Sequence, residues 1–510
     1  MLLKRRLSIT IVIVMLSTLA LIHHSRIGDW SSLDVRYHHD DAQHKETPVP
    51  IPPPPLPPIP RRPHADPACD GFPDTSRVLL VMKTGASESF AQVPTQLLTT
   101  LRCLSDFLIF SDMDQNIGGQ RIYDSLSTIS AEVQEGNVDF DLYRRQKWCP
   151  VNQAQCNALG DPRNEGWNLD KYKNVHIAAK AYAMRPGHDW YLFVDADTYV
   201  LWLNMMQWVN QLDPTQKLYL GSAAGLNNLN FAHGGSGYLV SKAAMDAFVG
   251  RAPEVGNEYD RYAKSVCCGD YIFALALKEK TRVEVQHMFP TINGEKPTTL
   301  PFGPSHWCQP IVTMHHLNAE EINMFWHFER RNQLVRTKSG KSRPLILKDV
   351  FEEFVVLHLN EIRRDWDNMA RDRVYLDRKA QMWDDGQLAR MKKAEDYNKY
   401  EKKAHLSFED CAAACKSLPY GECFQYKYQN GICTMGRAIT LGNPIRRGEE
   451  EDQRITSGWD VEKIRAWVRK HSKCDKISWP SVRTKKPVVL KTEMLIENGG
   501  AAVGHTTVLT

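Results

Sequence analysis

This 510-residue sequence has little excess of either charge, because 64 lysines and arginines are balanced by 60 aspartates and glutamates, for a formal net charge of only +4. No dense stripe of lysine and arginine with interleaved aromatic residues occurs, which argues against a nucleic-acid partner. The sequence also lacks any Asn-x-Ser/Thr sequon, so passage through the secretory pathway would add no N-linked glycan. We therefore expect neither a nucleic-acid partner nor an N-glycosylated surface.

Uncharged apolar runs are short, with one exception at the start. Residues 7–22, LSITIVIVMLSTLALI, form a sixteen-residue stretch without a charge that follows a lysine and two arginines. We expect 1–25 to be a cytoplasmic tail and an uncleaved signal anchor, which places the rest of the chain in the lumen under the positive-inside rule. The competing interpretation is a cleaved signal peptide, whose apolar region has about this length. Against cleavage, the small pair Thr18 and Ala20 lies inside the apolar run, and a short span suits the thinner membranes of the early secretory pathway.

Proline is concentrated in one segment, TPVPIPPPPLPPIPRRP, at residues 47–63. Proline at this density favours an extended, semi-rigid polyproline spacer. The alternative is a docking site for another protein. Together with the anchor, residues 26–76 are expected to form a stem that holds a folded body away from a lipid bilayer.

Twelve cysteines are present, and in an oxidising lumen most of them should pair. Four of them fall within 405–445, a density typical of a small disulfide-stapled module, in which FEDCAAACKS is expected to be a helix. The segment before this module, 336–404, is rich in charge and is expected to be a helical connector. Residues 446–510 are expected to be a C-terminal extension.

The main body, 77–335, shows strands that alternate with helical patterns. Strands are expected within SRVLLVMKTGASES, CLSDFLIFSDM and WYLFVDADTYV, and a helix within YKNVHIAAKAYAM. This alternation predicts an α/β fold with a mostly parallel sheet, whose ligands bind beyond the carboxyl ends of the strands. Residues 83–85, Asp112, Asp195 and Asp197 all lie at such ends, so we expect them to line one crevice.

Asp195 and Asp197 follow five apolar residues at a strand tip, where the chain can turn both carboxylates toward one ion. Hard oxygen ligands suit Mg²⁺ or Mn²⁺, especially where substrate phosphates complete the shell. The alternative is a pair of solvated loop acids. A hydrolase that uses the two as paired acids is disfavoured, because carboxylates two residues apart cannot flank a sugar.

Three further segments carry candidate site residues. The loop with Gly234, Gly235 and Gly237 permits close approach to a ligand, although a glycine-rich hairpin without a ligand has the same pattern. Asp270 begins an apolar helix, where an acid can also serve the helix dipole alone. The pair His315 and His316 closes an apolar strand, where a buried histidine is more often structural than a ligand.

Four motifs in this order resemble glycosyltransferase family 31, the group of Fringe and the core 1 β1,3-galactosyltransferases. They are DWYLFVDADTYVLW, HGGSGYLVSKAAM, GDYIFALAL and GPSHWCQPIVTMHHL, within about 77–330, and the opening VLLVMKTGASE is most similar to the fungal-type branch. The resemblance implies a type A glycosyltransferase fold, a Rossmann-like mixed sheet. It also implies inverting transfer of galactose or an N-acetylhexosamine from a UDP-sugar to a glycan or glycoprotein hydroxyl in the Golgi (or ER/Golgi) lumen, forming a β1,3 linkage on a single-pass type II membrane protein.

The resemblance also implies roles for residues. Asp195, Asp197 and His315 would hold Mn²⁺ or Mg²⁺ on the donor diphosphate, and Asp270 would be the general base. The remaining donor contacts would come from Thr84, Gly85, Asp112, Gly234, Gly235 and Gly237.

Two positions depart from the family pattern. Ala196 replaces the middle acid of its D-D-D motif, and Gly269 replaces the acid before the base. Both departures put a transfer of donor specificity from the family in doubt. The alternative function is a catalytically inactive family member that acts as a lectin-like or chaperone subunit.

The cysteine-rich module resembles a PAN/Apple domain, which binds protein or carbohydrate, although a stabilising appendage has the same pattern. Four cysteines allow three connectivities. We choose Cys411 with Cys433 and Cys415 with Cys423, and we expect Cys308 to pair with Cys267 or Cys268.

Overall fold

The computed structural model describes residues 66–339, 343–377, 384–448 and 454–482. The expected anchor at 1–25 and most of the stem lie outside the described residues. The chain divides into two compact units, Met1–Arg61 and Arg62–Thr510, and every described residue belongs to the second. Within the described ranges, no helix combines the length and the apolar character needed to cross a bilayer.

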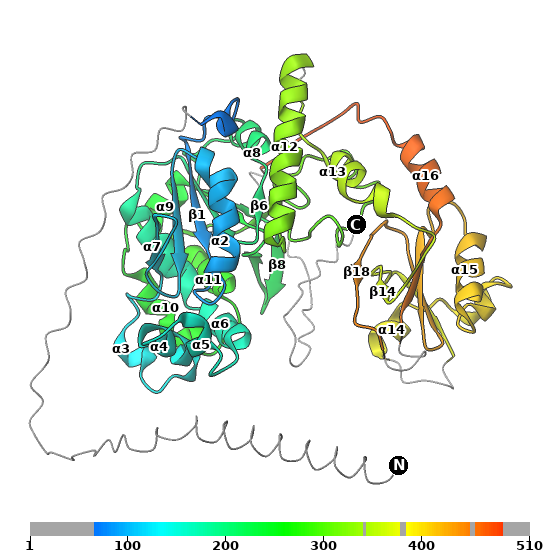
Figure 1. The fold of residues 1–510 in the computed structure, drawn as a ribbon, viewed down its shortest axis with the longest axis horizontal. Helices are drawn as coiled ribbons and strands as arrows, with labels where there is room; N and C mark the ends of the chain where they lie inside the picture. The colour runs from blue at the N-terminus through cyan, green and yellow to red at the C-terminus, as the bar shows by residue number, and fades with distance from the viewer. Residues whose placement is uncertain (1–65, 340–342, 378–383, 449–453, 483–510) are drawn as a thin grey trace, which may run out of the picture. The chain divides into compact units, whose positions relative to one another are not determined.

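A mixed sheet that includes β1 forms the centre of the main body (Figure 1). It has eight strands in the order β11-β7-β10-β5-β1-β2-β4-β3. The three strands predicted from sequence are confirmed and are parallel neighbours in the order β5-β1-β2. The antiparallel strand β10 pairs with β5 and makes the sheet mixed. The strands are β1 (Val78–Lys83), β2 (Phe107–Ser111), β3 (Gln115–Ile117), β4 (Gln120–Asp124), β5 (Trp190–Asp195), β7 (Tyr219–Gly221), β10 (Tyr238–Ser241) and β11 (Gln286–His287).

Alternating side chains of the central strands pack on opposite faces of this sheet. Leu79 and Val81 belong to the core under α7 and α11, whereas Val78 and Leu80 belong to the core under α2 and α8. This period of two is what a strand buried on both faces requires. The helices of the body are α2 (Ser89–Leu98), α7 (Lys173–Met184), α8 (Trp202–Val209), α9 (Lys242–Ala247), α10 (Val255–Ala263) and α11 (Gly269–Thr281).

Short helices fill the connection between β4 and α7 and gather at one end of the body in Figure 1. They are α3 (Ala131–Gln134), α4 (Asp141–Lys147), α5 (Gln153–Asn157) and α6 (Pro162–Asp170). A bond between Cys149 and Cys156 closes the turn between α4 and α5, and the Arg145–Glu165 ion pair joins α4 to α6. This connection ends at Asp170, which lies next to the carboxyl end of β1.

The body begins before residue 77, so the predicted stem boundary is wrong. Cys69 bonds to Cys103, and Phe72 packs against Trp326 on α12 (Ala319–Ser339). These contacts bury residues that the sequence placed in the stem. The polar composition around residue 70 hid this contribution, because a disulfide rather than an apolar pattern holds the segment.

A two-stranded pairing outside the main sheet connects two distant segments. The strand β6 (Tyr199–Val200) follows the DAD triplet and pairs antiparallel with β12 (Thr313–Met314). Leu317 donates its backbone N–H to the carbonyl of Asp197 at 2.9 Å, which extends the pairing. The loop after β5 and the strand before His315 are therefore held side by side.

The C-terminal residues form a second, five-stranded antiparallel sheet in the order β13-β19-β16-β17-β15. The expected connector at 336–404 is wrong as a separate element. After α12 and α13 (Leu347–Phe354), it supplies the two edge strands of this sheet. The boundaries 405–445 are likewise too narrow, because β19 lies beyond them. The elements are β13 (Ile362–Arg364), β14 (Trp366–Asp367), β15 (Arg373–Leu376), α14 (Asp385–Ala389), α15 (Phe408–Ser417), β16 (Gln425–Gln429), β17 (Ile432–Gly436), β18 (Asn443–Pro444), β19 (Thr456–Trp459) and α16 (Val461–Lys470).

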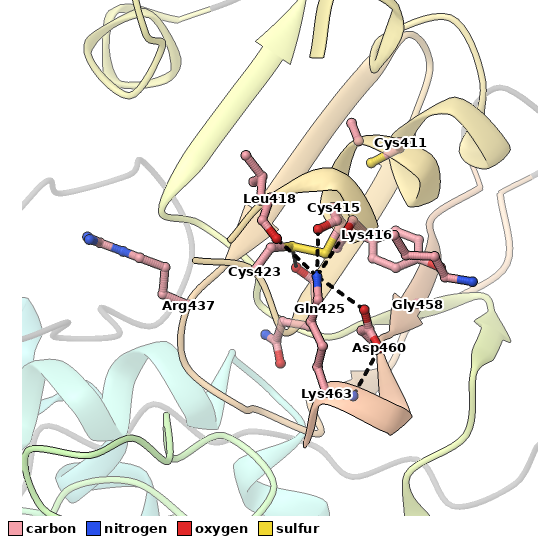
Figure 2. The surroundings of a disulfide bond; sticks show 12 residues. Cys411, Cys415, Lys416, Leu418, Cys423, Gln425, Arg437, Gly458, Asp460 and Lys463 are labelled. Carbon is pink, nitrogen blue, oxygen red and sulfur yellow. Dashed lines mark hydrogen bonds and ion pairs between the residues drawn. A yellow bond between two sulfur atoms is a disulfide. The ribbon is translucent and has the colours of Figure 1, made fainter. Parts of the chain in front are cut away.

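Figure 2 shows how Lys463 on α16 contacts the carboxyl end of α15, next to the Cys415–Cys423 disulfide. Lys463 on α16 donates from Nζ to the carbonyl oxygens of Cys415, Lys416 and Leu418, at 3.0, 3.2 and 3.4 Å. These carbonyls end α15, where unpaired acceptors and the negative end of the helix dipole favour a cation. The side chain therefore ties α16 to the carboxyl end of α15.

All twelve cysteines are paired. The expected bonds Cys411–Cys433 and Cys415–Cys423 are confirmed.

The expected bond from Cys308 to Cys267 or Cys268 is wrong. The latter two residues are adjacent and bond to each other, and Cys308 bonds to Cys474. The segment after α16 returns to the body, where Trp307 donates from its indole N–H to the carbonyl of His471 at 3.0 Å. This return brings Cys474 beside Cys308.

Candidate active site

The DAD triplet lies at the carboxyl end of β5, opposite the end of β1. Asp195 is in register with Lys83, whose Nζ lies 3.4 Å from a carboxylate oxygen of Asp195. Burial raises the pKa of Asp195, and the charge of Lys83 partly opposes this rise. Ala196 is buried in the apolar core below, so the middle acid of the family motif would place a carboxylate in that core.

Asp197 faces the two histidines that follow β12. A carboxylate oxygen of Asp197 lies 3.1 Å from Nε2 of His315, and the other lies 3.9 Å from Nδ1 of His316. Burial tends to raise the pKa of Asp197, but the hydrogen bond and charge of His315 bring it below its ordinary value. The three residues offer ligand atoms that all lie within 4.8 Å of one another.

A divalent cation fits the donor set of this three-residue group. One carboxylate and two imidazoles are ligands that Mn²⁺ and its neighbours accept. Asp195 is not part of the group, and its nearest charged partner is Lys83.

The glycine loop 234–237 lies against both the histidines and the helix that begins near Asp270. A Cβ added to Gly235 would lie 2.1 Å from Cε1 of His315, so only glycine allows this approach. Gly237 has a φ of +83°, which favours glycine. The Oγ1 of Thr198 donates to the carbonyl of Gly235 at 2.7 Å and fixes the loop beside the DAD triplet.

Asp270 lies in the first turn of α11 and touches the same loop. Its carboxylate accepts the backbone N–H groups of Gly234 and Tyr271, both at 2.8 Å. Burial raises the pKa of Asp270 to about 6, and these hydrogen bonds limit the rise. The departure at Gly269 has a steric cause, because a Cβ there would lie 2.8 Å from the carbonyl oxygen of Asp170.

A network of buried ion pairs, which was not predicted from the sequence, lies next to the candidate site. Lys83 lies 2.5 Å from Asp170, and Lys173 pairs with both Asp170 and Asp112. Burial disfavours the charged lysine, but the carboxylates of Asp170 and Asp195 raise the pKa of Lys83 above its ordinary range. The sequence contains one indication of this network, which is that Lys83 ends an apolar strand. The acidic partners of Lys83 could not be predicted, because their positions depend on the sheet register and on the turn between α6 and α7.

The turn after β1 contains the remaining candidate residues. Thr84 donates its backbone N–H to the end of β2, and Gly85 donates its own to the carboxylate of Glu88 at 3.3 Å. The carboxylate of Asp112 is fully buried and accepts the backbone N–H of Ala86 at 3.1 Å. Asp112 therefore stabilises this turn through the hydrogen bond that it accepts from Ala86.

One small pocket is lined by residues of β1, α7, β5 and the glycine loop. Its lining includes Lys83, Asn174, Asp195 and Gly234. Gly234 lines this pocket together with Asp195 and also donates its backbone N–H to Asp270, so the loop lies next to the carboxylates of both β5 and α11. The structure thus assembles the DAD triplet, the glycine loop, Asp270 and the histidine pair in one place.

A family model described as Fringe-like matches residues 167–289. The match runs from α6 to β11 and contains Asp195, Asp197, the glycine loop and Asp270, and it ends before His315. It supports the glycosyltransferase 31 family and hence a glycosyltransferase, and the large mixed sheet fits a type A fold. No curated protein matches the chain.

Proposed function

We propose that the protein is an inverting, divalent-metal-dependent glycosyltransferase. It transfers galactose or an N-acetylhexosamine from a UDP-sugar to a hydroxyl of a glycan or glycoprotein and forms a β1,3 linkage. The observation that carries this proposal is the glycine loop, which contacts Asp270 on one side and His315 on the other. The same loop thus lies next to both the candidate base and the candidate cation site.

The proposed base is Asp270. Its ionised carboxylate would accept the proton of the acceptor hydroxyl while that oxygen attacks the anomeric carbon and the bond from this carbon to UDP breaks. A base acts best with a pKa near the working pH, and the burial-raised pKa of about 6 meets this condition.

Asp197 and His315 are the proposed holders of Mn²⁺ or Mg²⁺, with Asp195 beside them. When bound, the cation would offset negative charge on the departing diphosphate. Thr84 and Gly85 are proposed to contact the nucleotide from the end of β1. Asp112 is proposed to act through the turn that it supports, because its carboxylate is occupied.

We also propose a single-pass type II protein of the Golgi membrane, with the enzyme in the lumen. Complete pairing of the twelve cysteines supports an oxidising compartment. The C-terminal sheet with α15 and its two disulfides is proposed to be a PAN/Apple-like module that binds the acceptor or a partner.

The test is sugar transfer by residues 62–510, which comprise the second compact unit. A panel of UDP-sugars is assayed with and without Mn²⁺, and UDP binding is measured separately by calorimetry. We expect transfer from one donor class that requires the cation. Absence of both turnover and cation-dependent UDP binding would refute the enzyme; UDP binding without turnover would favour the lectin-like alternative.

A further inference from the structure

The two consecutive histidines after β12 reach the same carboxylate. In a regular strand, neighbouring side chains point to opposite faces, so His315 and His316 could not both face Asp197. The backbone of His316 adopts a φ of +61°, in the left-handed region. This turn folds its ring back, and the two imidazole centroids lie 3.9 Å apart.

The left-handed conformation is disfavoured for a residue with a Cβ, so a histidine held there requires a reason. The side chain of His316 is 53% exposed, and core packing therefore does not explain its position. Its Nδ1 points to the free side of the Asp197 carboxylate at 3.9 Å, while Nε2 of His315 takes the other oxygen. Each oxygen of the carboxylate thus has a different imidazole nitrogen within 4 Å.

We propose that His316 is a ligand of the divalent cation, so that one carboxylate and two imidazoles, from Asp197, His315 and His316, hold the ion. This inference rests on the proposed metal-dependent function and adds a residue that the family resemblance does not supply. Asp195 is the less suitable protein ligand, because Lys83 already compensates its charge.

The donor set has a consequence for the choice of metal. Imidazole favours the later first-row metals, whereas Mg²⁺ prefers oxygen ligands. We therefore expect the wild-type chain with UDP to bind Co²⁺ more tightly than Mn²⁺, and Mn²⁺ far more tightly than Mg²⁺. Loss of His316 should narrow the difference between Mn²⁺ and Mg²⁺.

The test measures Mn²⁺ binding to the full chain in the presence of UDP, from the electron paramagnetic resonance signal of free Mn²⁺. The variant is His316→Gly, because glycine keeps the left-handed backbone without strain and removes the imidazole. We expect Mn²⁺ affinity to fall about tenfold or more, since even outer partners of metal ligands contribute about 10- to 100-fold. The matched control is the exposed His327 on α12, as His327→Asn, with unchanged affinity.

A second measurement needs no variant to fold. Pulsed electron paramagnetic resonance of bound Mn²⁺ detects ¹⁴N coupling from each coordinated imidazole, and we expect two imidazoles in the wild-type chain. One imidazole there, or unchanged affinity in His316→Gly, would overturn the role of His316. If Asp197→Ala and His315→Ala still lost Mn²⁺ in that case, the proposed function would stand. Failure of the wild-type chain with UDP to bind Mn²⁺ would overturn both.

Discussion

The carboxyl group of Asp270 combines partial burial with two backbone donors. Burial dominates and raises its pKa to about 6. A general base works only when ionised, so kcat/KM for transfer should fall about tenfold per pH unit below pH 6 and level off above it. A pH profile of kcat/KM with the preferred donor measures this limb directly.

Replacement of the base separates its role from that of the cation site. We expect Asp270→Asn to lower transfer by about 10²- to 10⁴-fold and to leave cation-dependent UDP binding intact. The exposed Asp114→Asn serves as the control acid. If Asp270→Asn lost both transfer and UDP binding, the role of Asp270 would be structural and not that of a base.

Gly235 provides a steric test of the histidine site. An added Cβ would lie 2.1 Å from Cε1 and 2.4 Å from Nε2 of His315, so the ring must move. We expect Gly235→Ala to weaken Mn²⁺ binding in the presence of UDP by about tenfold or more. Gly303→Ala is the matched control, because its Cβ would meet no atom within 4 Å. Equal Mn²⁺ affinity in the two variants would place the cation away from His315.

Sequence motifs predicted the candidate site residues, but they did not predict the buried ion pairs that balance the charges of those residues. Asp195, Asp197, Asp270 and His315 could be named because each stands at the end of an apolar element. The ion pair between Lys83 and Asp170 could not, since it depends on two segments brought together by the sheet and by α6. Local sequence carries the first kind of information and not the second.

At the scale of elements, α12 fastens the strand that follows the DAD triplet. Glu329 on α12 is buried, and its carboxylate accepts the hydroxyl of Tyr199 at 2.7 Å and the backbone N–H of Leu203 at 3.1 Å. The acid therefore joins α12 to β6 and to the first turn of α8. Burial raises the pKa of Glu329 from 4.5 to about 7.

This pKa predicts a pH-dependent stability. The folded chain keeps a proton on Glu329 that the unfolded chain releases above pH 4.5, so rising pH favours unfolding until about pH 7. Between pH 5 and 8, the free energy of unfolding of the wild type should fall by up to about 3 kcal/mol relative to Glu329→Gln.

Chemical denaturation at both pH values measures this difference. Glu320→Gln, an exposed acid on the same helix, should follow the wild type. Parallel pH profiles of Glu329→Gln and the wild type would mean that Glu329 is ionised in the folded chain.

Two of the strands that were not predicted from the sequence are edge strands. The strands β13 and β15 lie at the two edges of the C-terminal sheet, where charged residues such as Arg364 and Arg373 are tolerated and discourage further pairing. Such strands lack the apolar alternation from which strands are predicted. The strands β1, β2 and β5 are continuous apolar runs, so they could be predicted from the sequence, but their order in the sheet comes from the structure.

At the scale of the whole molecule, the C-terminal sheet shares a core with the main body. Trp459, Ile464 and Trp467 belong to the same apolar cluster as Trp307 and Phe351. The Cys308–Cys474 bond closes this cluster on one side. Each element buries apolar surface that the other would expose, so the two should unfold as one unit.

Trp467 tests this shared stability. The side chain is 3% exposed, and its ring centroid lies 4.8 Å from that of Trp307 in an edge-on contact. We expect Trp467→Ala to lower the free energy of unfolding by about 3–5 kcal/mol, because a buried ring leaves a cavity. The matched control is Trp167→Ala in α6, whose side chain is 48% exposed and should cost far less.

Two probes of one unfolding curve decide between shared and separate cores. Far-ultraviolet circular dichroism follows the whole chain, and cation-dependent UDP binding follows the site in the main body. We expect both to shift together in Trp467→Ala, since loss of α16 packing exposes the apolar surface of Trp307 and Phe351. If UDP binding kept its wild-type midpoint while part of the dichroism signal was lost earlier, the C-terminal sheet would be an independent module, and the shared cluster would contribute little to the stability of the site.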